Sequence, residues 1–103
     1  MSEAKVELTY EGDRVVLSGP LTFDTVSSLS REVNLFQNSG SSVTVDFAGV
    51  SRADSAALAL LLDWMRQASA KGRRVEFSNL PENMLALAKV SGIDELLPLR
   101  SSN

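Results

Sequence analysis

Residues 43–70, VTVDFAGVSRADSAALALLLDWMRQASA, decide the fold of this chain. The stretch opens with β-branched and aromatic residues from Val43 to Phe47, which is typical of a buried strand. From about Ser55 to Ala70 the apolar residues recur at helical spacing, and Lys71-Gly72 supplies a stop. A strand followed by a helix is the repeating unit of α/β proteins, so the pattern predicts a strand-to-helix junction at Asp54-Ser55-Ala56-Ala57.

The residues before this unit predict a β-hairpin and a helix. Apolar and polar residues alternate before a turn at Glu11-Gly12-Asp13, a second strand resumes after the turn, and Ser18-Gly19-Pro20 is expected to end it. The alternating apolar residues of the first strand are Val6, Leu8 and Tyr10, and the apolar residues of the second are Val15 to Leu17. A helical pattern follows, with Thr22 or Asp24 as its cap and Ser39-Gly40 as its stop. Its apolar residues are Phe23, Val26, Leu29, Val33 and Phe36.

The residues after the unit predict another strand and another helix. Arg73-Arg74 opens the strand, and Pro81 fits the first turn of the helix, which Gly92 ends. The residues expected to share one face of this helix are Met84, Leu87, Ala88 and Val90. One more short apolar turn is expected before Pro98.

The order β-β-α-β-α-β-α predicts a single α/β domain over residues 1–103. Right-handed crossovers between parallel strands place helices on at least one face of the sheet. We therefore expect a mixed, mostly parallel sheet of four to five strands packed with three to four helices. The tails, about 1–4 and 100–103, are expected to be loose.

The composition excludes several classes of function. The 103 residues are 44% hydrophobic and 22% charged, which fits one globular domain. Acidic and basic residues are interspersed along the chain at a net charge of -3, so we expect no basic stripe for nucleic acid. Because cysteine and histidine are absent, thiol chemistry and most zinc sites are excluded. The G-x-x-x-x-G-K-[ST] and G-x-G-x-x-G patterns are absent too. We therefore expect no catalytic residue, no metal and no cofactor.

The location is inferred from segments that the sequence lacks. Met1-Ser2-Glu3-Ala4-Lys5 does not resemble a secretory signal, and the longest apolar stretch, Ala56 to Leu62, is far shorter than the roughly 20 residues of a membrane span. We expect a cytoplasmic protein that reaches a membrane only through a partner.

The long helix carries a candidate partner-binding face. Projection at about 100° per residue predicts a core stripe of Leu58, Leu61, Leu62, Met65 and Ala68. Leu60 and Trp64 then fall on the polar side. Either Trp64 folds over a neighbouring helix and Leu60 is a scattered surface residue, or both belong to an exposed docking platform, which we favour. The residues predicted to bind the partner are Ser55, Ala56, Ala59, Leu60, Asp63 and Trp64.

The start of this helix has two compatible roles. Asp54 or Ser55 is expected to cap it by accepting a hydrogen bond from a first-turn amide. A helix N-terminus also stabilises negative charge, so Ser55 is a candidate phosphorylation site. Catalysis by Ser55 is a weak alternative, because no histidine can relay its proton.

Three separated segments together resemble the STAS domain family. They are Val16-Leu17-Ser18-Gly19-Pro20-Leu21, Val43 to Ser55, and Leu87-Ala88-Lys89-Val90-Ser91-Gly92-Ile93. The run from Val50 to Leu62 is most similar to the MlaB-type STAS subunits of phospholipid-transport ABC complexes. This resemblance implies a non-catalytic accessory subunit that binds and supports an MlaF-like ATPase and helps maintain outer-membrane lipid asymmetry.

The family also contains the anti-sigma factor antagonists, which give the alternative function. In these proteins the phosphorylated residue follows an aspartate at the start of the second helix, and Ser55 occupies the matching position. Their motif usually continues with Ser-Gly, whereas this chain continues with Ala56-Ala57. The resemblance therefore favours the transporter subunit over an antagonist regulated at Ser55.

Overall fold

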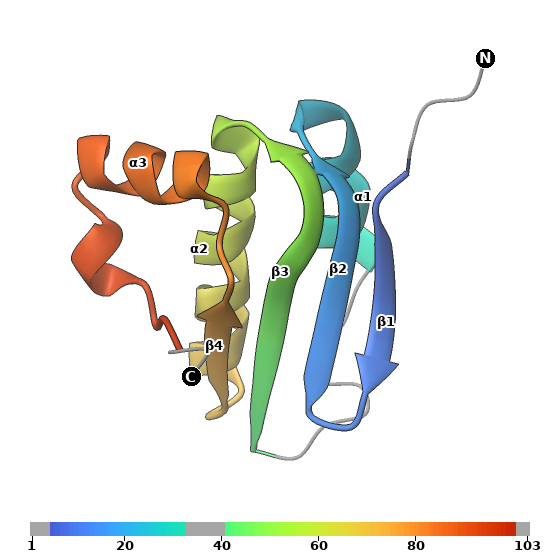
Figure 1. The fold of residues 1–103 in the computed structure, drawn as a ribbon. Helices are drawn as coiled ribbons and strands as arrows, with labels where there is room; N and C mark the ends of the chain where they lie inside the picture. Colours follow the sequence, from blue (N-terminus) through green and yellow to red (C-terminus); the bar gives the residue numbers. More distant parts are fainter. Residues whose placement is uncertain (1–4, 33–40, 101–103) are drawn as a thin grey trace.

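The computed structural model describes residues 5–32 and 41–100, whose strands form one sheet in the order β1-β2-β3-β4 (Figure 1). The strands are β1 (Glu7–Glu11), β2 (Arg14–Leu21), β3 (Ser42–Ala53) and β4 (Arg74–Ser78). β1 runs antiparallel to β2, whereas β3 runs parallel to both β2 and β4. The predicted mixed, mostly parallel sheet is confirmed.

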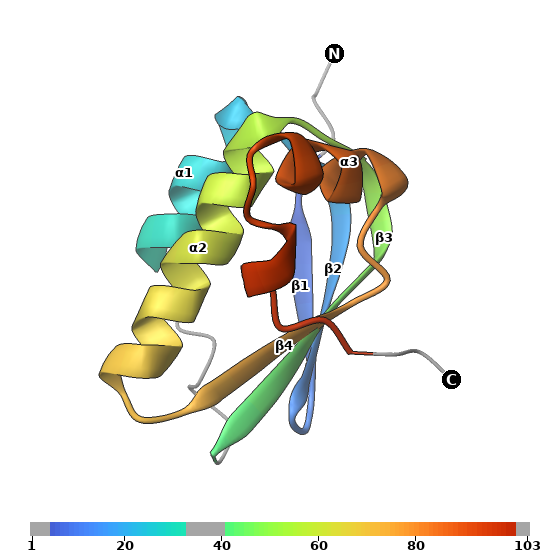
Figure 2. The same ribbon diagram turned by 90° about the vertical axis from the view of Figure 1, so that its left-hand side faces the viewer.

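The helices lie on one face and one edge of this sheet. They are α1 (Phe23–Glu32), α2 (Ser55–Ala70), α3 (Glu82–Val90) and a short 3-10 helix, η1 (Asp94–Leu96). α1 and α2 cover one face, and α3 lies beside the β4 edge (Figures 1 and 2). Within residues 5–32 and 41–100 no helix covers the opposite face. The predicted α/β domain with three to four helices is therefore confirmed.

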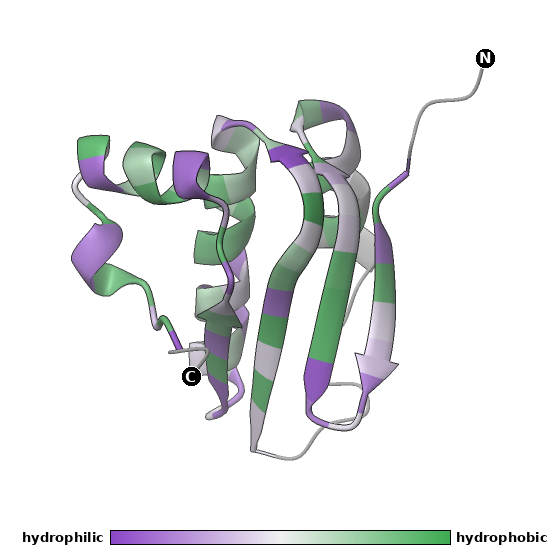
Figure 3. Ribbon diagram, viewed as in Figure 1, coloured by the Kyte–Doolittle hydropathy of each residue, from purple (hydrophilic) through white to green (hydrophobic). Residues whose placement is uncertain are grey.

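The core forms between the sheet and the two covering helices. Alternate strand residues are buried, which gives the banded hydropathy of the strands in Figure 3. They include Val15, Leu17, Val43, Val45, Phe47, Val75 and Phe77. Phe47 and Phe77 meet edge to face with ring centroids 5.8 Å apart, a favourable geometry for aromatic pairs.

β2 and β3 both run further than the sequence pattern indicates. The prediction that Ser18-Gly19-Pro20 breaks the strand is wrong, because β2 continues to Leu21 and absorbs these residues through two shifts in its register with β3. Gly19 has φ +97, and a Cβ there would collide with the backbone of Lys5. The extended β3 reaches Ala53, directly before the junction.

Fewer apolar residues of α1 are buried than its sequence pattern predicts. Val26 and Leu29 are buried, but Phe23 is 80% exposed. Phe23 lies about 120° from Leu29 around the helix, so it points away from the sheet. Val33, Phe36 and the predicted stop at Ser39-Gly40 lie outside the described residues.

The C-terminal part also departs from the pattern at two positions. Met84 and Ala88 of α3 are buried, but Val90 is 87% exposed, so its predicted place on the same face is wrong. Arg100, expected in a loose tail, is instead held against β4 by a hydrogen bond from its amide to the Phe77 carbonyl (2.8 Å). The rest of the expected tails, 1–4 and 101–103, lies outside the described residues.

Candidate functional site

Three helices begin at the same end of the sheet, where the parallel strands have their carboxyl ends. β2, β3 and β4 are parallel, and each is followed by a helix, so α1, α2 and α3 all begin near the carboxyl ends of the strands (Figure 1). The Asn83 side chain in the first turn of α3 donates to the Ala53 carbonyl (2.7 Å). The amide of Asp54 donates to the Leu21 carbonyl (3.1 Å). These contacts connect the end of β3 to the start of α3 and to the end of β2.

Asp54 links two of these helices through its carboxylate. Oδ1 accepts from the Ala56 amide (2.9 Å), and Oδ2 accepts from the Phe23 amide (3.1 Å). Asp54 is therefore the N-cap of α2 and also satisfies an amide at the start of α1. The sequence indicated a cap at Asp54 or Ser55, and the structure assigns it to Asp54.

Ser55 is left exposed beside a surface hollow. The hollow has a volume of about 300 Å³ and is lined by Thr22, Phe23, Asp24, Arg52, Ala53 and Asp54. The exposed ring of Phe23 belongs to it, and sequence reasoning missed this residue by assigning it to the core. The signal that could have found it is its angle to Leu29 on the helical wheel.

The predicted outward platform on α2 is wrong at its two largest residues. Leu60 is 1% exposed and Trp64 is 0% exposed, so both lie in the core. Ala56 is half-buried, and only Ser55 and Ala59 of the predicted set are exposed. The alternative interpretation, in which Trp64 packs against a neighbouring helix and Leu60 is a scattered surface residue, agrees with the burial of Trp64 but is wrong for Leu60.

The error has a simple geometric cause. α2 contacts α1, α3 and β4, so its buried arc is much wider than a single stripe facing a sheet. Leu58, Leu61 and Ala68 are buried as predicted, whereas Leu62 and Met65 are only half-buried. The true buried arc is centred closer to Trp64 than to Met65.

A narrower face of α2 remains open. We refer to this surface as the outer face of α2. Its residues recur at three- and four-residue spacing and are Ser55, Ala59, Leu62, Asp63 and Arg66. The Asp63 carboxylate lies 3.8 Å from the Arg66 guanidinium and accepts a hydrogen bond from the Gln67 side-chain amide (3.0 Å). The face is therefore small and flat at Ser55 and Ala59, and charged further along the helix.

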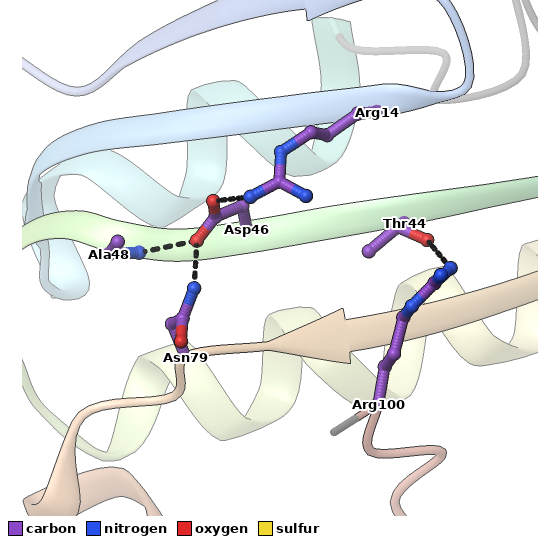
Figure 4. A network of polar contacts seen from close by, with 6 residues as sticks. All are labelled: Arg14, Thr44, Asp46, Ala48, Asn79 and Arg100. Atoms are coloured by element: carbon purple, nitrogen blue, oxygen red, sulfur yellow. Dashed lines mark hydrogen bonds and ion pairs between the residues drawn. The ribbon is translucent and has the colours of Figure 1, made fainter. Parts of the chain in front are cut away.

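A second polar cluster lies on the uncovered face of the sheet (Figure 4). Asp46 of β3 is buried, pairs with the Arg14 guanidinium, and accepts from the Ala48 amide (2.9 Å) and the Asn79 side chain (2.9 Å). Burial alone would raise the pKa of Asp46, but the bonds from Asn79 and Ala48 together with Arg14 hold it below its ordinary value of 3.8. Every oxygen of this carboxylate has a partner, which indicates a structural role.

The lowered pKa of Asp46 predicts acid-dependent stability. A depressed folded-state pKa stabilises the domain above the unfolded-state value, and this contribution is lost as the pH falls through the folded-state value. We expect Asp46→Asn to be less stable than wild type at pH 7, with a difference that shrinks below pH 3.8. Urea denaturation across a pH series measures it, and a difference that widens on acidification would contradict this account.

Neither metal chemistry nor a membrane span is indicated by the described residues. Within them, no group of three or more His, Cys, Asp or Glu side chains is placed to hold a metal ion. None of the described helices is long and apolar enough to cross a membrane.

Comparison with known proteins decides the family. A family model described as "Mlab, STAS domain" matches residues 4–98, nearly the whole chain. The chain belongs to the STAS domain family. STAS domains generally act as regulatory or accessory modules and not as enzymes. No curated protein sequence matches this STAS chain.

Solved structures support the same fold. The phosphorylated form of SpoIIAA, a cell fate determinant of Bacillus, has a TM-score of 0.65 at 22% identity over 94% of this chain and 92% of its own. The unphosphorylated form of the anti-sigma factor antagonist SpoIIAA has a TM-score of 0.69 at 20% identity, covering 94% and 89%. An anti-sigma factor antagonist domain protein from Planctomyces limnophilus has a TM-score of 0.67 at 22% identity, covering 97% and 92%. At these identities the likeness establishes the fold alone.

Proposed function

We propose that this STAS domain is a non-catalytic accessory subunit that binds the ATPase of an ABC phospholipid transporter and supports its activity. The match to an MlaB-type family model over residues 4–98 supports this proposal. Such a subunit would lie on the cytoplasmic side of the inner membrane, held there by its partner, and would serve outer-membrane lipid asymmetry.

The docking surface that we propose is the outer face of α2 together with Phe23. Ser55 and Ala59 present small side chains on which a partner helix can pack closely, and Phe23 is a large exposed aromatic at the same edge of the domain. Arg66 and Asp63 provide a polar rim at the far end. This surface replaces the predicted set that included Leu60 and Trp64.

The experiment that tests this surface compares two alanines on the same helix. Ala59 and Ala70 are both exposed, and alanine and arginine have similar helix propensities, so Ala59→Arg and Ala70→Arg are both expected to fold. We expect Ala59→Arg to weaken binding to the transporter ATPase by at least about tenfold, because it places a long cation at the centre of the interface. Ala70→Arg should bind like wild type.

Affinity purification followed by mass spectrometry identifies the partner. Recovery of a transport ATPase with wild type and Ala70→Arg, but not with Ala59→Arg, supports the proposal. Equal recovery with all three proteins would exclude the outer face of α2 as the docking surface, and recovery of no transport ATPase with wild type would exclude the transporter function.

The alternative is an anti-sigma factor antagonist regulated at Ser55. The observation that favours it is the exposure of Ser55 directly after the Asp54 cap, where the first-turn amides and helix dipole stabilise added negative charge. This function predicts a kinase-type anti-sigma factor in the purification and a phosphate on Ser55 in the recovered protein. Detection of both by mass spectrometry would favour it over the transporter.

A further inference from the structure

A groove separate from the junction lies along the outer edge of β4. It has a volume of about 400 Å³, within the roughly 300–1,000 Å³ of protein ligand sites. We call it the β4 groove. Its apolar lining consists of Met65 and Ala68 of α2, Val75 of β4, and Leu96 and Pro98. Leu96 is 63% exposed, so the lining is open to an incoming molecule.

The backbone of β4 is available along this groove. Up to Arg100, where the described residues end, the C-terminal segment pairs with β4 only at Phe77, whose amide donates to the Pro98 carbonyl (2.9 Å) and whose carbonyl accepts from the Arg100 amide (2.8 Å). Val75, two residues earlier, points its amide and carbonyl to the same edge because backbone groups alternate along a strand. Proline has no N–H, so Pro98 cannot continue the ladder to the Val75 carbonyl. In the described part of the chain the ladder ends there.

The charged residues that line the groove are mainly basic, and the acidic residues Asp94 and Glu95 of η1 precede the lining residue Leu96. Arg73 and Arg74 line it at the start of β4, and Arg74 is exposed. Glu76 is the acidic residue in the lining, and its carboxylate lies 3.6 Å from the Arg100 guanidinium. An occupant with negative charge is therefore complementary to this groove, although the whole chain has a net charge of -3.

We propose that the β4 groove binds a short acidic segment of a partner protein in an extended conformation. The segment adds a strand to the edge of β4 beside Val75, and its carboxylates face Arg74. Alternate side chains of the segment lie on Met65 and Leu96, since a strand points every second residue to the same side. A peptide fits better than an anionic lipid, because it also pairs with the backbone of Val75.

The test is a titration of the ¹⁵N-labelled protein, followed by NMR, with a synthetic hexapeptide that alternates glutamate and valine and has blocked ends. We expect shifts of the amides of Arg73 to Phe77 and of Leu96. Arg74→Glu should weaken binding by at least about tenfold, because attraction becomes repulsion. The matched control is Arg66→Glu, which makes the same charge change at an exposed arginine on the outer face of α2 and should leave binding unchanged.

A second variant and three further probes complete the design. Leu96→Asp adds a negative charge at an exposed position of the lining and should weaken binding as Arg74→Glu does. Equal affinity for a peptide of alternating lysine and valine would overturn the charge argument. Unchanged affinity for the acidic peptide methylated on alternate amide nitrogens would overturn strand addition. Shifts of the same amides by phosphatidylglycerol vesicles, but not by the peptide, would overturn the peptide as occupant.

Discussion

Replacing Trp64 by alanine is expected to destabilise the domain by about 3–5 kcal/mol, the usual cost of removing a buried aromatic side chain. Trp64 is 0% exposed and lies on a helix that contacts α1, α3 and β4. Several elements would therefore have to shift to close the cavity that the alanine leaves. Against a total stability of about 5–15 kcal/mol, such a loss is severe. Urea denaturation followed by circular dichroism measures it.

Trp64→Phe separates the packing of this residue from its polar group. The indole Nε1 is buried and has no hydrogen-bond partner among the described residues, so its removal leaves no broken bond. We expect Trp64→Phe to cost no more than about 2 kcal/mol, from the smaller ring volume. A Trp64→Ala protein within about 1 kcal/mol of wild type would contradict the buried position of this residue.

Adjacent positions on α2 provide the matched comparison for burial. Leu60→Asp places a carboxylate in the core, where an unpaired charge costs several kcal/mol, whereas Ala59→Asp places the same group in solvent. We expect the first protein to be unfolded and the second to be folded. Loss of partner binding in Leu60→Asp would therefore report unfolding and not a docking contact.

The sequence predicted the strands and helices because these depend on local periodicity, and the mostly parallel sheet followed from the order of these elements. The alternation through Val43, Val45 and Phe47 and the helical spacing after Ser55 are strong signals, and both are present in the structure. The face of α2 was predicted less well, because a helical wheel contains no information about how many neighbours the helix has. Leu60 and Trp64 were placed outside by a projection that assumed one contact surface.

The polar contacts of the candidate site and of the Asp46 cluster were beyond local pattern analysis. The bond from Phe23 to Asp54 joins residues 31 positions apart, and the bond from Asn79 to Asp46 joins residues 33 positions apart. Spacing within one element cannot reveal such pairs. A weak signal existed for Asp46, because an acidic residue between Val45 and Phe47 in a buried strand requires partners.

Replacing Asp54 by alanine is expected to destabilise the domain by about 2–3 kcal/mol, since it removes a helix cap worth about 1 kcal/mol and a charge-assisted hydrogen bond worth about 1.5 kcal/mol or more. The two bonds come from different helices, through Ala56 of α2 and Phe23 of α1. Asp54→Asn retains one side-chain oxygen and so can satisfy only one of the two amides. Its expected cost, about 1–2 kcal/mol, is accordingly smaller.

Amide hydrogen exchange distinguishes this linking role from an ordinary cap. If Asp54 satisfies both helix starts, Asp54→Ala should lower the protection of the Phe23 amide as well as that of Ala56. Asp24→Ala, in the first turn of α1, is the matched control and should cost about 0.5 kcal/mol or less. Loss of protection confined to α2 would show that Asp54 caps a single helix.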